Sequence, residues 1–141
     1  MSDIRVNKIN QQEELNQAFK IRKEVFVVEQ SVDESEEYEF EDESTHFIAK
    51  VDNEYAGTAR WRITKNGVKL ERFAVLNTFR SMGVGSALLN AVVADIPKEH
   101  TYLYLHAQIT AMGLYAKFGF IAEGDEFIEA DIRHYKMVLR R

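Results

Sequence analysis

The most informative segment of the sequence connects a predicted strand to a predicted helix: Val75-Leu76-Asn77-Thr78-Phe79-Arg80-Ser81-Met82-Gly83-Val84-Gly85-Ser86. Helix N-termini have unpaired backbone N–H groups and a partial positive charge, so they hold phosphate groups well. Gly83 and Gly85 let oxygen atoms approach the backbone, and Arg80 adds a positive charge. We therefore expect this turn to bind a phosphate or pyrophosphate. The alternative is a tight turn whose glycines serve packing.

Two familiar nucleotide-binding motifs fit this turn poorly. A P-loop requires Lys and then Ser or Thr after its last glycine, but Gly85 is followed by Ser86 and Ala87. The dinucleotide fingerprint requires a third glycine where this chain has Leu88, and it usually lies near the start of its domain. The turn is therefore typical of neither class.

On both sides of this turn, periodicity and turn signals predict strands and helices along the whole chain. The predicted strands are 4–9, 46–51, 55–63, 68–75, 102–107, 120–127 and 134–139, and the predicted helices are 15–26, 83–96 and 109–118. The order of these elements predicts a mixed sheet with a right-handed parallel crossover around the helix that begins at Gly83. We expect one three-layer α/β/α domain over residues 1–141.

Composition limits the function classes. The 141 residues include 45% hydrophobic and 29% charged residues, which is typical of a folded globular chain. Without cysteine there is no disulfide or thiolate, and the four histidines show no close metal-ligand spacing. We expect no metal. The sequence also shows no signal-peptide pattern and no apolar run long enough for a membrane span, so we expect a soluble, cytoplasmic protein.

The net charge of −5 is concentrated in residues 33–43, which contain eight acids and no base. Without these eight acids the net charge becomes +3, so the rest of the chain tolerates a polyanionic cofactor. No block of Lys and Arg indicates a nucleic-acid surface, and we expect neither nucleic acid nor membrane as a partner. We interpret the acidic run as a solvated loop, with electrostatic steering of a cationic acceptor as the alternative.

Two blocks of the sequence resemble the GNAT family of N-acetyltransferases. One is Arg80-x-x-Gly83-x-Gly85 after the strand Leu70–Val75, and the other is Gln108-x-x-Ala111-x-x-Leu114-Tyr115-x-x-Phe118-Gly119-Phe120. The resemblance implies acetyl-CoA as co-substrate and a sheet that splays between the strands at Val68 and Tyr102, with pantetheine in the gap. The residues it implies for cofactor binding are Phe73, Ala74, Val75, Arg80, Ser81, Met82, Gly83, Val84, Gly85, Ser86, Gln108 and Lys117. Gln108 departs from the family's usual Asn.

A narrower resemblance covers 22–30 and 105–108, which are similar to a bacterial subgroup of acetyltransferases without a generally defined substrate. Arg22, on an otherwise apolar helical stripe, is expected to line the acceptor cleft or to pair with Glu29, with a stem that reaches solvent as the alternative. Glu29, His46 and His106 are further candidates for lining the acceptor site, although a structural hydrogen bond is the more ordinary role of a lone histidine.

Amide formation from acetyl-CoA requires removal of a proton from the amine and protonation of the thiolate. The resemblance implies Tyr115 as the general acid, with a helix aromatic packed in the core as the alternative. Glu71, acting through water, is our first choice of base, with a solvated carboxylate beside Lys69 or Arg72 as the alternative. Strand alternation predicts that Glu71, Phe73 and Val75 share one face and Leu70, Arg72 and Ala74 the other.

The function expected from these observations is transfer of an acetyl group to an amine of a small molecule. An acyl-homoserine-lactone-type synthase is one alternative, because the segment from Phe26 to Glu29 resembles such enzymes. A non-catalytic sensor that binds acyl-CoA is another. A homodimer is compatible with the resemblance, since many relatives dimerise.

Overall fold

The computed structural model describes residues 2–33 and 39–141. Seven strands form one sheet in the order β1-β2-β3-β4-β5-β7-β6. The strands are β1 Ile4–Lys8, β2 Thr45–Val51, β3 Glu54–Thr64, β4 Gly67–Val75, β5 Tyr102–Gln108, β6 Ile121–Glu129 and β7 Ile132–Arg140. The α-helices of the described residues are α1 Gln12–Arg22, α3 Val84–Asp95 and α4 Met112–Phe118.

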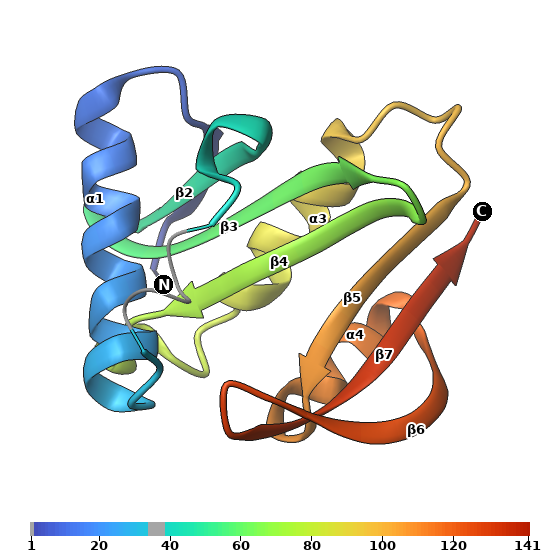
Figure 1. The fold of residues 1–141 in the computed structure, drawn as a ribbon. Coiled ribbons are helices and arrows are strands. Elements are labelled where there is room, and N and C mark those ends of the chain that lie inside the picture. The colour runs from blue at the N-terminus through green and yellow to red at the C-terminus, as the bar shows by residue number, and fades with distance from the viewer. Residues whose placement is uncertain (1, 34–38) are drawn as a thin grey trace.

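The helices cover both faces of the sheet, as Figure 1 shows, with α1 on one face and α3 and α4 on the other. On the α1 side, Ala18 and Ile21 pack on Ile48 of β2. On the other side α3 buries its apolar face, including Leu88 and Leu89, against the sheet. Burial of a side chain of this size stabilises a fold by about 2 kcal/mol. The three-layer α/β architecture expected from the sequence is confirmed.

The sheet splays at its centre. β4 and β5 are parallel and pair only at Val68 with Leu103 and Lys69 with Tyr104. Beyond these pairs β5 continues along β7, from Tyr102 to Gln108, without β4 beside it. The second half of β4 is therefore left with a free backbone edge that faces the gap, as the family resemblance implied.

A β-bulge interrupts the alternation of β4. Thr58 pairs with Ala74 and Arg60 with Glu71, so one residue of β3 lies opposite two residues of β4, Arg72 and Phe73. Arg72 supplies the extra residue in a left-handed conformation, with a φ of 58°. As a result, the face prediction for this strand is wrong beyond the bulge: Phe73 packs with the core on the α3 side, together with Leu70 rather than with Glu71.

The first predicted helix continues beyond α1 as a π-helical segment, Lys23–Glu29. Such segments are rare and are frequently found at functional sites. Part of the acidic run, residues 34–38, lies outside the described residues. Its end forms a short 3₁₀ turn, Glu41–Glu43. No helix among the described residues is long and apolar enough to cross a bilayer.

Candidate active site

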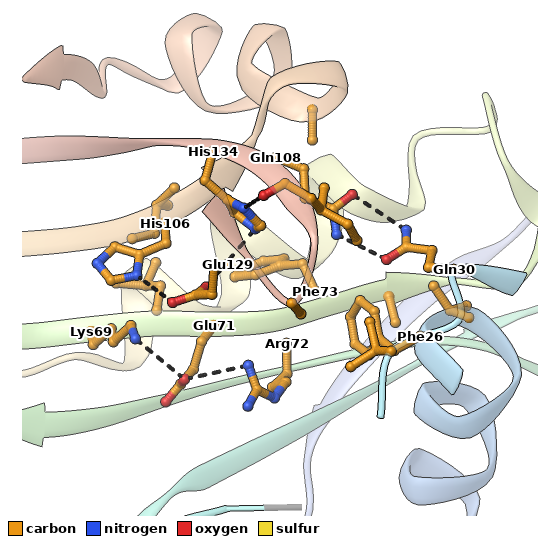
Figure 2. A pocket seen from close by; sticks show the side chains of 18 of the residues that line it. Phe26, Gln30, Lys69, Glu71, Arg72, Phe73, His106, Gln108, Glu129 and His134 are labelled. Carbon is orange, nitrogen blue, oxygen red and sulfur yellow. Dashed lines mark hydrogen bonds and ion pairs between the residues drawn. The ribbon is translucent and has the colours of Figure 1, made fainter. Parts of the chain in front are cut away.

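A cavity of about 600 Å³ lies where β4 and β5 diverge. One wall is β4 from Lys69 to Val75, and the opposite wall comes from β5, β7 and the end of β6. Phe26 of the π-helical segment and Tyr115 of α4 also line the cavity. Figure 2 shows side chains from both halves of the sheet pointing toward one another across this space. A volume of this size suits a small molecule or the arm of a larger one.

The glycine-rich turn follows β4 and leads into α3. Ser81 and Gly83 both have positive φ, 64° and 94°, so the chain turns sharply before the helix. Among the residues that the structure describes, no side chain caps the N-terminus of α3, and its first amides have no partner within the helix. Gly85 has a packing role, because a Cβ there would lie 3.2 Å from Leu114 of α4. The free amides fit a pyrophosphate as donors, and Gly85 lets α3 approach α4.

Two consecutive residues, Glu29 and Gln30, contact predicted cofactor residues on either side of the splay. The guanidinium of Arg80 donates two hydrogen bonds to the carboxylate of Glu29, at 2.5 and 2.8 Å. Arg80 also donates from Nε to the carbonyl oxygen of Val75 at 3.0 Å. The side-chain amides of Gln30 and Gln108 exchange hydrogen bonds at 2.9 and 3.3 Å. The structure therefore pairs Glu29 with Arg80 rather than with Arg22.

Glu71 lies among cations. It is only 8% exposed. Its ion-pair partners are Arg60 at 3.2 Å, Lys69 at 3.8 Å, Arg72 at 3.8 Å and Arg62, which also hydrogen-bonds to it. Burial opposes ionisation of Glu71, but the charges of Arg60 and Lys69 outweigh it and hold the pKa of this carboxyl below its usual range. Figure 2 shows the contacts to Lys69 and Arg72 at the cavity wall.

Arg22 and His46 belong to a different cluster. Arg22 is 1% exposed and pairs with Glu41 at 2.9 Å, and Glu41 also pairs with the buried Arg60. His46 Nε2 donates to the backbone carbonyl of Glu41 at 3.0 Å. Its side chain faces a separate hollow of about 330 Å³ at the start of α1. The structure thus places Arg22 and His46 away from the walls of the main cavity.

Tyr115 is 6% exposed and packs edge-to-face on Phe73, with ring centroids 5.7 Å apart. Its ring also contacts Phe120 at 6.2 Å. Burial raises the pKa of the phenol above its ordinary value of 10.0. The hydroxyl therefore stays protonated at neutral pH, so it can donate a hydrogen bond inside the cavity.

Three titratable side chains from β5, β6 and β7 meet at the opposite wall. His106 Nδ1 lies 3.2 Å from Glu129 Oε1, and His134 Nε2 lies 3.9 Å from Glu129 Oε2. The hydrogen bond from His106 lowers the pKa of Glu129 to about 2. The ring of Phe127 contacts both imidazoles, with centroids 5.0 Å from that of His106 and 5.7 Å from that of His134. Among the described residues, no cluster of His, Asp and Glu side chains is arranged to hold a metal ion.

Only some of the predicted site residues line the cavity. Tyr115, Glu71, Arg80, Gln108 and His106 line it, as does the stretch Phe73–Val75. The turn from Ser81 to Ser86 and the side chain of Lys117 do not line it.

Sequence reasoning missed His134, Glu129, Gln30 and the cations Arg62, Lys69 and Arg72 as lining residues. Gln30 and Arg72 lie in segments that carry the family resemblance, but no role was expected of their side chains, and the other four residues lie in no motif. Only the pairing of His134 opposite Gln108 across β5 and β7 brings His134 to the site, and that register is a tertiary feature.

Comparisons with known proteins agree with this geometry. The family description "Acetyltransferase (GNAT) domain" matches residues 6–141. YjcF, an uncharacterized N-acetyltransferase of Bacillus subtilis, is 38% identical over 130 residues, which cover 90% of this chain and 93% of YjcF. An acyl-CoA N-acyltransferase from Pseudomonas aeruginosa has a similar structure, with a TM-score of 0.80, 24% identity and 99% coverage of both chains. A Bacillus subtilis acetyltransferase in complex with CoA also has this fold, with a TM-score of 0.71, 15% identity and 99% coverage of both chains. The chain therefore belongs to the GNAT family and is an acyl-CoA-dependent N-acetyltransferase with acetyl-CoA as its co-substrate.

Proposed function

We propose that the protein transfers the acetyl group of acetyl-CoA to an amine of a small-molecule acceptor, which attacks the thioester directly. The observation that carries the proposal is the cavity of about 600 Å³ between β4 and β5, with the free edge of β4 on one side and Tyr115 in its wall. A space of this size suits an acetylated pantetheine end together with a small amine.

The residues around the splay provide suitable contacts for the co-substrate. Backbone groups of Phe73 and Ala74 on the free edge of β4 can pair with the amides of pantetheine. The amides that begin α3 after Gly83, with the guanidinium of Arg80 nearby, suit the pyrophosphate. Gln108 lies at the end of β5, on the other side of the gap.

We further propose Tyr115 as the proton donor to the departing sulfur. A phenol that burial keeps protonated can hydrogen-bond a thiolate as the carbon–sulfur bond breaks. Glu71 remains a candidate base from the sequence. However, four cations stabilise its ionised form, and this makes the carboxylate a weaker proton acceptor.

The test is thiol release from acetyl-CoA by purified protein in the presence of a panel of amines, with calorimetry for acetyl-CoA alone. We expect binding of acetyl-CoA without an amine, and thiol release only when a suitable small amine is added. Binding of acetyl-CoA without thiol release in the presence of any amine of the panel would favour a non-catalytic acyl-CoA sensor. Release that requires S-adenosylmethionine would favour a homoserine-lactone-type synthase. No measurable affinity for CoA or acetyl-CoA would contradict the proposal.

A further inference from the structure

We propose that His134 is the general base of the reaction and that Glu129 binds the ammonium group of the acceptor beside it. This assignment rests on the proposed function and names the residues that prepare the amine. Both side chains line the main cavity, on the wall opposite β4, and neither belongs to a motif of the sequence. Figure 2 shows the two side chains close together, with His106 on the other side of Glu129.

A hydrogen bond from Nδ1 fixes the tautomer of the His134 ring. Its Nδ1 atom lies 2.7 Å from the backbone carbonyl oxygen of Ile132. A carbonyl oxygen only accepts hydrogen bonds, so Nδ1 must carry the proton. In the neutral ring Nε2 is then the atom with a lone pair. His134 is 5% exposed and its Nδ1 partner belongs to the same strand, so the ring is held with Nε2 toward Glu129.

The two carboxylate oxygens of Glu129 face different histidines. His106 Nδ1 donates to Glu129 Oε1 at 3.2 Å, and this hydrogen bond holds Glu129 ionised. The other oxygen, Oε2, faces His134. His106 is therefore a positioning residue, which aims the free oxygen of Glu129 at the place where an acceptor nitrogen is needed.

The distance between the two acceptor atoms, one on Glu129 and one on His134, suits a single ammonium nitrogen. Glu129 Oε2 and His134 Nε2 lie 3.9 Å apart, which is too far for a direct hydrogen bond. One ammonium nitrogen can lie about 2.9 Å from both atoms and donate a hydrogen to each. No side-chain donor of the described residues reaches His134 Nε2, so this pair of acceptors is available to a ligand from the cavity. An alkylammonium ion has the donors that this pair requires.

Glu71, the other carboxylate of the cavity, is not available in the same way. Arg60, Arg62 and Lys69 contact its oxygens, so an ammonium group there would meet positive charges. Lys69 also favours the ionised form of Glu129, but through its charge alone and behind the hydrogen bond from His106. The two carboxylates therefore have different roles: Glu71 neutralises cations, and Glu129 receives the acceptor.

The proposed reaction transfers the acetyl group and moves two protons. His134 Nε2 takes one proton from the bound ammonium group, and the nitrogen lone pair then forms a bond to the carbonyl carbon of the thioester. The carbon–sulfur bond breaks as the amide forms, and the remaining excess proton of the nitrogen goes to the sulfur through the Tyr115 hydroxyl. His134 later releases its proton to water, so amide, free thiol and one proton are the products.

The first experiment needs no identified acceptor and uses n-butylammonium as the probe. Nitrogen-15 NMR of histidine-labelled protein at about pH 8 should show His134 with its proton on Nδ1, and n-butylammonium should shift its Nε2 resonance. Glu129→Gln should weaken that response at least about fivefold, because a charge-assisted hydrogen bond is lost. A proton on Nε2, or a response equal in the wild type and in Glu129→Gln, would overturn the proposal.

The second experiment uses the amine found by thiol release. His134→Gln should lower kcat at least about 100-fold while the affinity for acetyl-CoA changes within about twofold. The loss should be much smaller with hydroxylamine, which is already unprotonated at neutral pH. Added imidazole should partly restore His134→Ala, which separates lost chemistry from lost folding.

His100→Gln, a change at a histidine outside the cavity, should keep full activity and serves as the matched control. Wild-type turnover with undiminished activity in both His134 variants would remove this residue from the mechanism. Failure of the wild type to release thiol with any amine would instead count against the proposed function, and the NMR experiment would still decide whether His134 and Glu129 bind an ammonium ion.

Discussion

At the scale of single residues, Tyr115 shows how burial prepares a side chain for catalysis. Its ring is packed against Phe73 and Phe120, and burial keeps its hydroxyl protonated. Tyr115→Phe keeps the packing and removes only the donor. We expect kcat to fall about 100-fold, with the affinity for acetyl-CoA unchanged within about twofold. Steady-state kinetics and calorimetry measure the two effects. Tyr55→Phe, on β3 and outside the cavity, is the control, and normal turnover in Tyr115→Phe would refute the acid role.

Arg80 presents a competition between two anions. Its guanidinium is bidentate on Glu29, although the neighbouring turn suits a pyrophosphate. We expect Arg80→Ala to weaken acetyl-CoA binding about tenfold, because a charge-assisted hydrogen bond between the guanidinium and the pyrophosphate is lost. Glu29→Gln should strengthen binding several-fold, because it releases Arg80 and removes a negative charge near the phosphates. Calorimetry at two salt concentrations measures both. Weaker binding in Glu29→Gln would mean that Glu29 holds Arg80 in place rather than competing for it.

Sequence reasoning found the residues that lie in motifs and missed those that come together only by folding. Arg80, Gly83 and Tyr115 lie in two recognisable blocks, so their place near the splay was predictable. His134 and Glu129 come from the last two strands, and their meeting depends on the register between β6 and β7. A pattern of residue types along the chain carries no information on that register, so the opposite wall of the cavity could not be predicted.

At the scale of elements, β4 shows where periodicity fails. Alternation predicted the two faces of this strand correctly up to Glu71. The extra residue at Arg72 then reverses the faces of the following residues. Bulges are frequent next to active sites because they redirect side chains. Here the bulge turns Phe73 toward Tyr115, and Glu71 stays with the cations on the other face. The backbone strain at Arg72 has no sequence signal, since arginine does not favour a positive φ.

The contact between β3 and α3 depends on a glycine that the sequence did not single out. A Cβ at Gly57 would lie 2.9 Å from the carbonyl oxygen of Ala74 and about 3 Å from side chains of Val84 and Leu88. We expect Gly57→Ala to lower the free energy of unfolding by about 2 kcal/mol, because α3 must move away from the sheet. Urea denaturation measures this change.

The matched control is Gly113→Ala in α4, where a Cβ would have no atom within 4 Å. Alanine favours the helix over glycine, so this variant should be unchanged or more stable by up to about 1 kcal/mol. Equal stability of both variants would show that β3 and α3 are packed less closely at Gly57 than the structure indicates.

At the scale of the whole molecule, most of the fold could be predicted from the order of the strands and helices. The predicted helix 83–96, between the predicted strands 68–75 and 102–107, fixed the crossover between the parallel strands β4 and β5, because such connections are almost always right-handed. How far β4 and β5 separate was implied by the family resemblance and not by the residues themselves. The separation is a property of the entire sheet, in which β5 pairs with β4 over two residues and with β7 over seven.

The pKa values of His46, Glu71 and Glu129 are lower in the folded protein than in the unfolded chain, so acid destabilises the fold through each of these groups. Burial lowers the pKa of His46, so the folded chain resists a proton that the unfolded chain takes up near pH 6.5. The pKa of Glu71 is held low mainly by Arg60 against the effect of burial, and that of Glu129 lies at about 2. The unfolded state therefore binds more protons than the folded state whenever the pH falls through these ranges.

We expect acid to destabilise the protein in two stages. Below about pH 6.5 the contribution of His46 is lost, with a slope of at most about 1.4 kcal/mol per pH unit for one proton. Below about pH 5 the contributions of Glu71 and Glu129 begin to be lost as the unfolded carboxyl groups take up protons. Urea midpoints from pH 7.5 down to pH 4 measure both stages. His46→Gln should flatten the first stage and Glu129→Gln part of the second, whereas the exposed Glu54→Gln should change neither. A constant midpoint between pH 7.5 and pH 5.5 would show that His46 takes up its proton equally well in the folded chain, and the burial of this side chain would then have no electrostatic cost.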